Sequence, residues 1–159
     1  MGFPIRLTLA ALGCILLATS VAAETKGAPV DKTMTVLYVE DQDRATTFYG
    51  ATLDQPPVLH VPGMTEFTLT ETSSLGLMPE TGIRKLLGDA LPDPAGARGV
   101  PRAELYLLID DPVAYLERAR LAGARILDEV KPRDWGDRAG YCLDPDGHVL
   151  AFAAPLADH

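Results

Sequence analysis

The feature of the sequence that most restricts its fold is a pattern of elements that occurs twice. Met34 to Glu40 is an apolar run typical of a strand, and the capping residues Asp41-Gln42-Asp43 and a stop at Gly50 bracket apolar residues at helical spacing. Three shorter strands are predicted next, at Val58 to Val61, Glu66 to Thr70 and Leu75 to Met78. The first half therefore predicts a strand, a helix and three strands.

The second half repeats this order. Glu104 to Ile109 is again apolar, and Asp111 followed by Pro112 marks the start of a helix that Gly123 ends. Strands are predicted at Arg125 to Val130, Arg138 to Leu143 and Val149 to Ala153. Met34 lies seven residues before Asp41 and Glu104 lies seven before Asp111, so Met34 and Glu104 are equivalent positions of the repeat.

A βαβββ unit has one helix and can cover only one face of its sheet, so two such units are expected to associate. We predict an α+β fold in which two βαβββ modules, at about residues 33–79 and 102–155, form a cup-shaped mixed sheet with an internal cleft. The segment from Glu80 to Pro101 is rich in Gly and Pro. It is expected to be a linker with at most a short helical turn, either covering the cleft mouth or serving as a plain connector.

The segment Asp144-Pro145-Asp146-Gly147-His148 lies between two apolar runs and predicts a β-hairpin turn near the end of the chain. With the repeated elements, this hairpin resembles the last hairpin of the vicinal oxygen chelate superfamily, which includes glyoxalase I, bleomycin and fosfomycin resistance proteins and extradiol dioxygenases. The resemblance extends from about Met34 to Ala154. Trp135-Gly136-Asp137-Arg138 is also similar to a Trp-Gly loop beside the cleft of many bleomycin-resistance-like members.

The resemblance implies four metal-ligand positions, which in this sequence are Met34, about Gly76, Glu104 and Ala151. Only Glu104 offers an oxygen ligand of the kind that a divalent ion bound by substrate oxygens requires. We therefore expect no metal ion and no other cofactor.

Strand alternation predicts which side chains line the cleft. If Leu105, Leu107 and Ile109 pack under the second helix, then Glu104 and Tyr106 point into the cleft, and the same argument selects Met34 and Tyr38 in the first half. Aromatic rings suit a planar small molecule. The predicted ligand-binding residues are Met34, Tyr38, Glu104, Tyr106, Trp135, Arg138 and Tyr141.

Glu104 is the candidate for any catalytic role, as an acid or base if burial raises its pKa. It could equally be a ligand's hydrogen-bond acceptor, or a structural residue paired with Arg102 or Arg138.

Residues 1–23 have the pattern of a signal peptide: Arg6, an apolar stretch, and Val21-Ala22-Ala23 before a cleavage point at Glu24. We expect a periplasmic or secreted protein without stable membrane insertion after cleavage, a tail at 24–32 and one domain at 33–159. An uncleaved anchor and lipidation at Cys14 are the alternatives. Removal of the signal leaves Cys142 as the only cysteine, which is expected to be a small buried residue.

The net charge is −8, and the Lys and Arg residues do not cluster in the sequence. Because binding to phosphates needs a basic surface, no nucleic-acid partner is expected. The open strand edges of βαβββ units, and the dimers common among resistance-type relatives, favour a homodimer. The leading hypothesis is an exported, metal-independent small-molecule-binding protein. The alternatives are a lyase or isomerase of the same fold that uses Glu104 with a Tyr or a nonstandard metal site, and an inactive interaction domain.

Overall fold

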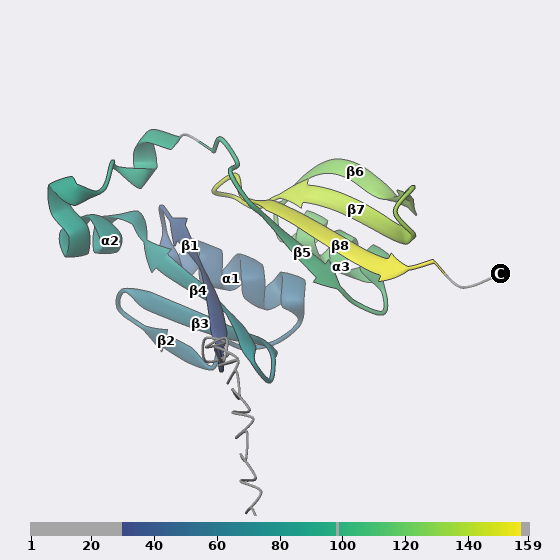
Figure 1. Ribbon diagram of the computed structural model, residues 1–159, viewed down its shortest axis with the longest axis horizontal. Helices are drawn as coiled ribbons and strands as arrows, with labels where there is room; N and C mark the ends of the chain where they lie inside the picture. Colours follow the sequence, from purple (N-terminus) through teal and green to yellow (C-terminus); the bar gives the residue numbers. More distant parts are fainter. Residues whose placement is uncertain (1–29, 98, 157–159) are drawn as a thin grey trace, which may run out of the picture.

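A computed structural model describes residues 30–97 and 99–156 of the chain (Figure 1). The predicted signal peptide at 1–23, most of the predicted tail and Cys14 lie outside these residues. No helix among the described residues has the length and apolar character needed to span a membrane.

The first half folds as a βαβββ module, as predicted. Its elements are β1 (Thr33–Val39), α1 (Gln42–Leu53), β2 (Leu59–Val61), β3 (Met64–Thr70) and β4 (Ser73–Pro79). The sheet order is β1-β4-β3-β2, with β1 parallel to β4 and the other neighbours antiparallel.

The second half repeats the module. It consists of β5 (Glu104–Leu108), α3 (Pro112–Leu121), β6 (Arg125–Pro132), β7 (Asp137–Leu143) and β8 (Val149–Pro155). The sheet order β5-β8-β7-β6 matches the first, again with the first and last strands parallel. The prediction of an α+β fold with two βαβββ modules is confirmed. The described strands form two separate four-stranded mixed sheets and no closed barrel.

Matching caps begin the two module helices. The carboxylate of Asp41 accepts a hydrogen bond from the backbone N–H of Arg44 at 2.9 Å, and Asp111 accepts one from Ala114 at 3.1 Å. Each satisfies a donor that a helix N-terminus leaves unpaired. Each helix therefore begins at the residue directly after its capping aspartate.

The connector is more helical than the sequence predicts. It contains α2 (Glu80–Leu87) and the short 3₁₀ helices η1 (Gly88–Ala90) and η2 (Pro94–Ala97). Ile83 of α2 is 6% exposed, while Leu86 is 71% exposed. A single buried anchor therefore holds α2 beside β4 and β1, where Figure 1 shows it away from the second sheet.

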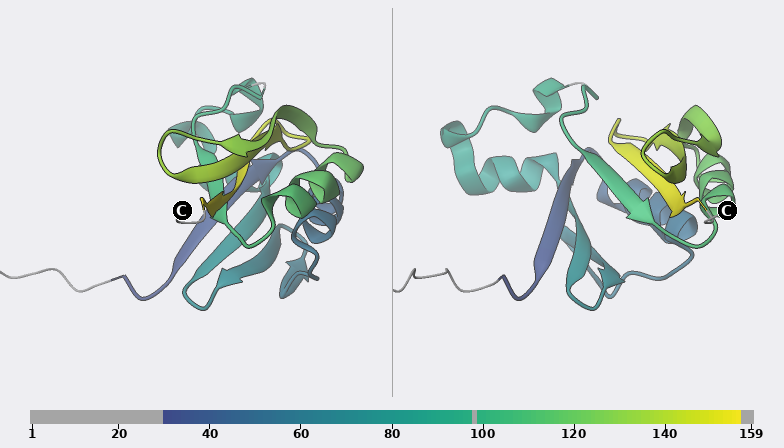
Figure 2. Two further views of the ribbon diagram at one scale, coloured as in Figure 1. Left: turned by 90° about the vertical axis from the view of Figure 1, so that its right-hand side faces the viewer. Right: turned by 45° about the vertical axis from the view of Figure 1, so that its right-hand side comes forward.

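The core lies where the two module helices pack on each other. In Figure 1, α1 lies behind β1 and β4, and α3 lies behind the second sheet; Figure 2 shows the same arrangement from two other sides. One continuous apolar cluster joins the modules and includes Phe48, Tyr49, Leu116, Cys142 and Phe152. Cys142 is fully buried, as predicted, and burial raises the pKa of its thiol to about 12.

Polar contacts also join the modules. The hydroxyl of Tyr49 in α1 donates to the Asp144 carboxylate at 2.8 Å, and the Arg44 guanidinium contacts Asp146 at 2.7 Å. The guanidinium of Arg118 in α3 donates to the carbonyl of Thr52 at 3.1 Å. The relative orientation of the modules is thus set by side chains of α1, α3 and the β7–β8 turn.

The faces of both sheets opposite the helices are left uncovered. Leu105 and Leu107 pack against the core, as predicted, so Glu104, Tyr106 and Leu108 point to the other face. Leu108 is 64% exposed, and Met34 on the corresponding face of β1 is 41% exposed. Within one chain, these faces are open to solvent.

Candidate functional site

The uncovered face of the second sheet carries a cluster of three aromatic residues, Tyr106, Trp135 and Tyr141, together with Glu104 and Asp137. We call this cluster the aromatic wall. Tyr106 of β5 and Tyr141 of β7 are both in register with Ala151 of β8, which lies between them, so their side chains share a face. Ala151 itself is fully buried.

Hydrogen bonds fix the orientation of Trp135 although it is 56% exposed. Its indole N–H donates to the hydroxyl of Tyr106 at 3.1 Å. That hydroxyl donates in turn to Oδ2 of Asp137 at 2.7 Å. Burial and the Asp137 hydrogen bond raise the pKa of Tyr106. Tyr106 is therefore a protonated link between the carboxylate and the indole.

Tyr141 and Glu104 lie near each other on the same face. Burial raises the pKa of Tyr141, and the negative charge of Glu104 adds to the rise. Glu104 itself is exposed, and it forms no ion pair with Arg102 or Arg138 within the described part of the chain. Its carboxylate remains accessible to a ligand.

Arg133 and Asp128 also belong to this region, although the sequence analysis did not select them. The guanidinium of Arg133 is 5.1 Å from the centre of the Tyr141 ring and 5.9 Å from that of Trp135. It pairs with Asp128 at 3.0 Å. Asp137, two residues after Trp135, could have been found from strand alternation with Tyr141. No sequence pattern indicates the Arg133 contacts, because they depend on the fold of the turn.

The predicted residues of the first half lie on the other sheet. Met34 and Tyr38 point to the uncovered face of β1, where Met34, Val36 and Met64 crowd around Gly76. A Cβ atom at Gly76 would be 3.1 Å from the sulfur of Met34. This face is separate from the aromatic wall within one chain, and it is not purely apolar, because Glu66 is in register with Gly76.

Arg138 is not part of the aromatic wall. It is next to Ala139 in β7, and Ala139 shares a face with Tyr141, so Arg138 points to the opposite, helix-covered side. Its guanidinium donates to the carbonyl of Asp110, just before α3, at 3.1 Å. The structure brings together Glu104, Tyr106, Trp135 and Tyr141 of the predicted set and leaves Arg138 apart.

The residues at the implied metal positions do not fit a divalent metal ion. Gly76 and Ala151 have no donor side chain, and the thioether of Met34 is a soft ligand unsuited to oxygen-preferring ions. Among the described residues, no group of three or more His, Cys, Asp and Glu side chains could hold a metal.

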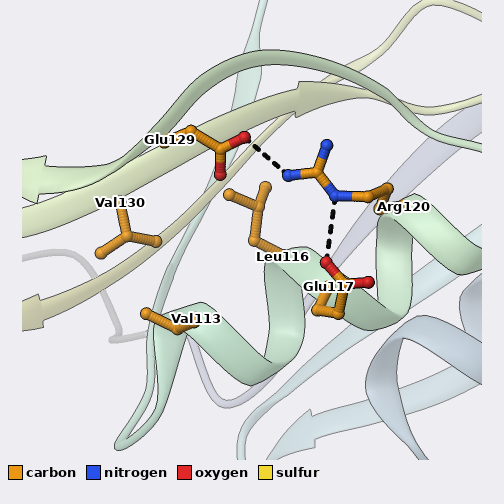
Figure 3. A pocket seen from close by; sticks show the side chains of 6 residues that line it. All are labelled: Val113, Leu116, Glu117, Arg120, Glu129 and Val130. Atoms are coloured by element: carbon orange, nitrogen blue, oxygen red, sulfur yellow. Dashed lines mark hydrogen bonds and ion pairs between the residues drawn. The ribbon is translucent and has the colours of Figure 1, made fainter.

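Two hollows lie away from the aromatic wall. The smaller, about 140 Å³, lies between α3 and β6 and is bordered by Arg120, which bridges Glu117 at 3.0 Å and Glu129 at 2.6 Å (Figure 3). The larger, about 470 Å³, is open and is lined by residues around the start of α1, including three carboxylates and His60. Neither is lined by a residue that the sequence predicts for the site.

In a comparison with known protein families, residues 31–152 match the sequence profile of the Glyoxalase/Bleomycin resistance protein/Dioxygenase superfamily. An uncharacterized protein of Mycobacterium bovis is 26% identical over 125 residues, which are 77% of this chain and 82% of that protein. An uncharacterized protein of Mycobacterium tuberculosis is 26% identical over 125 residues, covering 77% of this chain and 73% of that protein.

Solved structures show the same fold. A glyoxalase-related enzyme from Fulvimarina pelagi matches with a TM-score of 0.65 and 22% identity over 76% of this chain and 85% of its own. A glyoxalase/bleomycin resistance protein/dioxygenase from Nocardioides matches with a TM-score of 0.66 and 21% identity, covering 86% of this chain and 89% of its own.

Proposed function

Because this chain belongs to the Glyoxalase/Bleomycin resistance protein/Dioxygenase superfamily, we propose that it binds a planar, positively charged small molecule without a metal ion. The observation that carries the proposal is the aromatic wall, in which a hydrogen-bonded indole and two phenol rings lie beside the carboxylates of Glu104 and Asp137. Aromatic faces and carboxylates together favour flat cations over neutral molecules. The net charge of −8 adds a general attraction for cations at low salt.

A homodimer is part of the proposal. Met34 and Leu108 are apolar and exposed on the uncovered sheet faces, and β1 and β5 are edge strands in the described sheets. A second copy can cover both faces if the first sheet of one chain opposes the second sheet of the other. Each cleft would then be enclosed by Met34 and Tyr38 from one chain and the aromatic wall from its partner.

A lyase or isomerase that uses Glu104 with a tyrosine, or with a nonstandard metal site, has less support. The pKa values of Tyr106 and Tyr141 are raised, so both phenols stay protonated at neutral pH and cannot act as bases. The Tyr106 hydroxyl is already engaged by Asp137 and Trp135. Simple binding needs none of these groups to transfer a proton.

Export to the periplasm or the medium is proposed from the pattern of residues 1–23. Amino-terminal sequencing of the protein expressed with its whole chain tests this, and Glu24 is the expected first residue of the mature form. A first residue upstream of Glu24 would contradict cleavage at that point.

The binding proposal is tested with two probes of the same shape, N-methylquinolinium and neutral methylnaphthalene. Trp135 is the only tryptophan of the chain, so its fluorescence reports binding at the wall directly. We expect the cation to quench this fluorescence at lower concentration than the neutral probe. Glu104→Gln should weaken cation binding by about two- to fivefold, the range of an exposed ion pair, and leave the neutral probe unaffected.

Glu71→Gln is the matched control, because Glu71 is exposed in the turn between β3 and β4 and its loss changes the net charge equally. Equal weakening by both variants would attribute the effect to overall charge and contradict a site at Glu104. Elemental analysis of the purified protein tests metal independence. One tightly bound Zn, Fe, Mn or Ni per chain that is lost in Glu104→Ala would overturn it.

A further inference from the structure

Arg133 has an unusual set of contacts for a residue in a turn between two strands. It follows β6 and precedes Trp135, yet its side chain is only 13% exposed. Its Nε and Nη2 atoms donate to the carbonyl of Ala139 at 3.1 and 2.6 Å, and Nη1 donates to Asp128 at 3.0 Å. All three guanidinium nitrogens are therefore engaged within the protein.

The guanidinium also lies near two rings of the aromatic wall. Its central carbon is 5.1 Å from the centre of the Tyr141 ring and 5.9 Å from that of Trp135, within the range of cation–π attraction. The backbone N–H of Arg133 donates to the carbonyl of Asp137 at 2.7 Å, which closes the turn that carries Trp135. One residue thus fastens the turn to β7 and contacts both rings.

We propose that Arg133 is a positioning residue that holds Trp135 and Tyr141 in the orientation in which their faces are presented to a ligand. It acts through these rings and does not touch the ligand. The inference rests on the proposed function only in treating the aromatic wall as the ligand surface. It assigns to Arg133 a role in specificity for flat molecules, because both ring planes must be fixed for stacking.

The role requires an arginine and not only a positive charge. A planar guanidinium can bond the Ala139 carbonyl with two nitrogens and Asp128 with the third while it stays within cation–π distance of both rings. A lysine ammonium is a compact charge on a flexible stem and cannot make this set of contacts together.

Lys131 provides an internal comparison. Its ammonium pairs with the same Asp128 carboxylate at 2.8 Å, but its side chain is 55% exposed. Among the described residues, it is the guanidinium of Arg133 and not the ammonium of Lys131 that bonds the Ala139 carbonyl and lies near the rings. Asp128 therefore keeps a cationic partner when Arg133 is replaced. Arg133→Met removes the hydrogen bonds that attach the turn to Ala139 and the contacts with the rings of Trp135 and Tyr141.

The experiment uses the fluorescence of Trp135, the chain's only tryptophan, and needs no ligand for its first readout. Acrylamide quenching and steady-state anisotropy are measured on the full-length wild type, Arg133→Met, Arg133→Lys and Lys131→Met. Thermal melting followed by circular dichroism checks that each is folded. We expect both Arg133 variants to be quenched more strongly and to show lower anisotropy, with Lys131→Met unchanged.

The second readout is the affinity for N-methylquinolinium. Arg133→Lys keeps the charge, so we expect a loss of about two- to tenfold from misplaced rings alone, comparable to removing one hydrogen-bonded contact. Folded Arg133 variants with wild-type quenching would overturn the inference, as would full retention of both readouts in Arg133→Lys. If Trp135 becomes mobile as expected but wild type binds neither N-methylquinolinium nor methylnaphthalene, the positioning role stands and the proposed function fails.

Discussion

A methyl group added at Gly140 in β7 should destabilise the folded protein. A Cβ atom there would be 2.8 Å from side-chain carbons of both Leu116 and Val130 and 3.0 Å from the backbone nitrogen of Val130. We predict that Gly140→Ala lowers the free energy of unfolding by about 1–3 kcal/mol, as overpacked cores do. Urea denaturation followed by circular dichroism measures this change.

Gly96 in η2 is the control for Gly140, because a Cβ atom there would meet no other atom of the described residues within 4 Å apart from its chain neighbours. Gly96→Ala should change stability by less than about 0.5 kcal/mol, as surface substitutions do. A Gly140→Ala protein as stable as Gly96→Ala would show that α3 moves away from β7 without cost.

At the same scale, strand alternation is enough to predict the faces of Glu104 and Tyr106. The predicted site nevertheless included both Arg138 and Tyr141, although residues three apart in a strand point to opposite faces. Arg133 could not be predicted, because its partners are set by the turn conformation and by the register shifts of β6 against β7. The periodicity of a strand indicates neither the conformation of the turn nor a shift in strand register.

At the scale of elements, the β7–β8 turn joins the second module to α1. Asp144 accepts from Tyr49 at 2.8 Å and contacts Nδ1 of His148 at 2.9 Å. Burial alone would lower the pKa of His148, but the Asp144 carboxylate raises it, with smaller contributions from Asp146 and Glu80. Burial alone would raise the pKa of Asp144, but its bonds to His148 and Tyr49 lower it.

These opposite shifts fix the pH window in which the turn is most stabilising. The raised pKa of His148 contributes stability below its ordinary value of 6.5, and this is lost as pH rises through the raised value. The lowered pKa of Asp144 contributes above its ordinary value of 3.8 and is lost as pH falls through the lowered value. The turn is therefore most stabilising between the ordinary pKa of Asp, 3.8, and the ordinary pKa of His, 6.5.

We predict that His148→Gln lowers the free energy of unfolding more at about pH 5 than at about pH 9, because only the charged imidazole is favoured by Asp144. Urea denaturation at the two pH values measures the difference. His60→Gln is the control: His60 is more exposed, and its ring nitrogen is 3.4 Å from the exposed Asp43. An equal effect of His148→Gln at both pH values would contradict a charged pair in the turn.

Capping and periodicity predict the order of the module elements, but the sequence predicts at most a short helical turn where the structure has the eight-residue helix α2. Its sequence contains Gly82 and is flanked by Pro79 and Gly88, which favour irregular structure. The helix forms because Ile83 is buried against the first module. Tertiary burial of this kind outweighs local propensity and is not visible in a short window of sequence.

At the scale of the whole molecule, the prediction is a dimer at micromolar concentration in multi-angle light scattering. Met34→Glu and Leu108→Glu should shift the mass toward the monomer, since each puts a charge on an uncovered sheet face. Leu121→Glu is the control, because Leu121 is 79% exposed at the end of α3 and lies on neither face. A wild-type protein of monomeric mass would contradict the shared cleft.

The relative placement of the two sheets could not be predicted from the sequence. Alternation assigns faces within a strand, but the angle between modules depends on contacts such as that of Tyr49 with Asp144, which are 95 residues apart. The sequence predicts only that each sheet has a bare face that must be covered. The structure shows how α1 and α3 join the modules while leaving both faces open.

The confinement of each sheet to one continuous stretch of chain has a consequence for synthesis on the ribosome. All four strands of the first sheet have been translated once Pro79 is reached, before any strand of the second exists. Yet β1 must wait for its parallel neighbour β4, a non-local pairing that slows folding. Phe48 and Tyr49 then remain without α3 until some forty more residues have emerged. The nascent first half is therefore the stage at which a chaperone would have most apolar surface to protect.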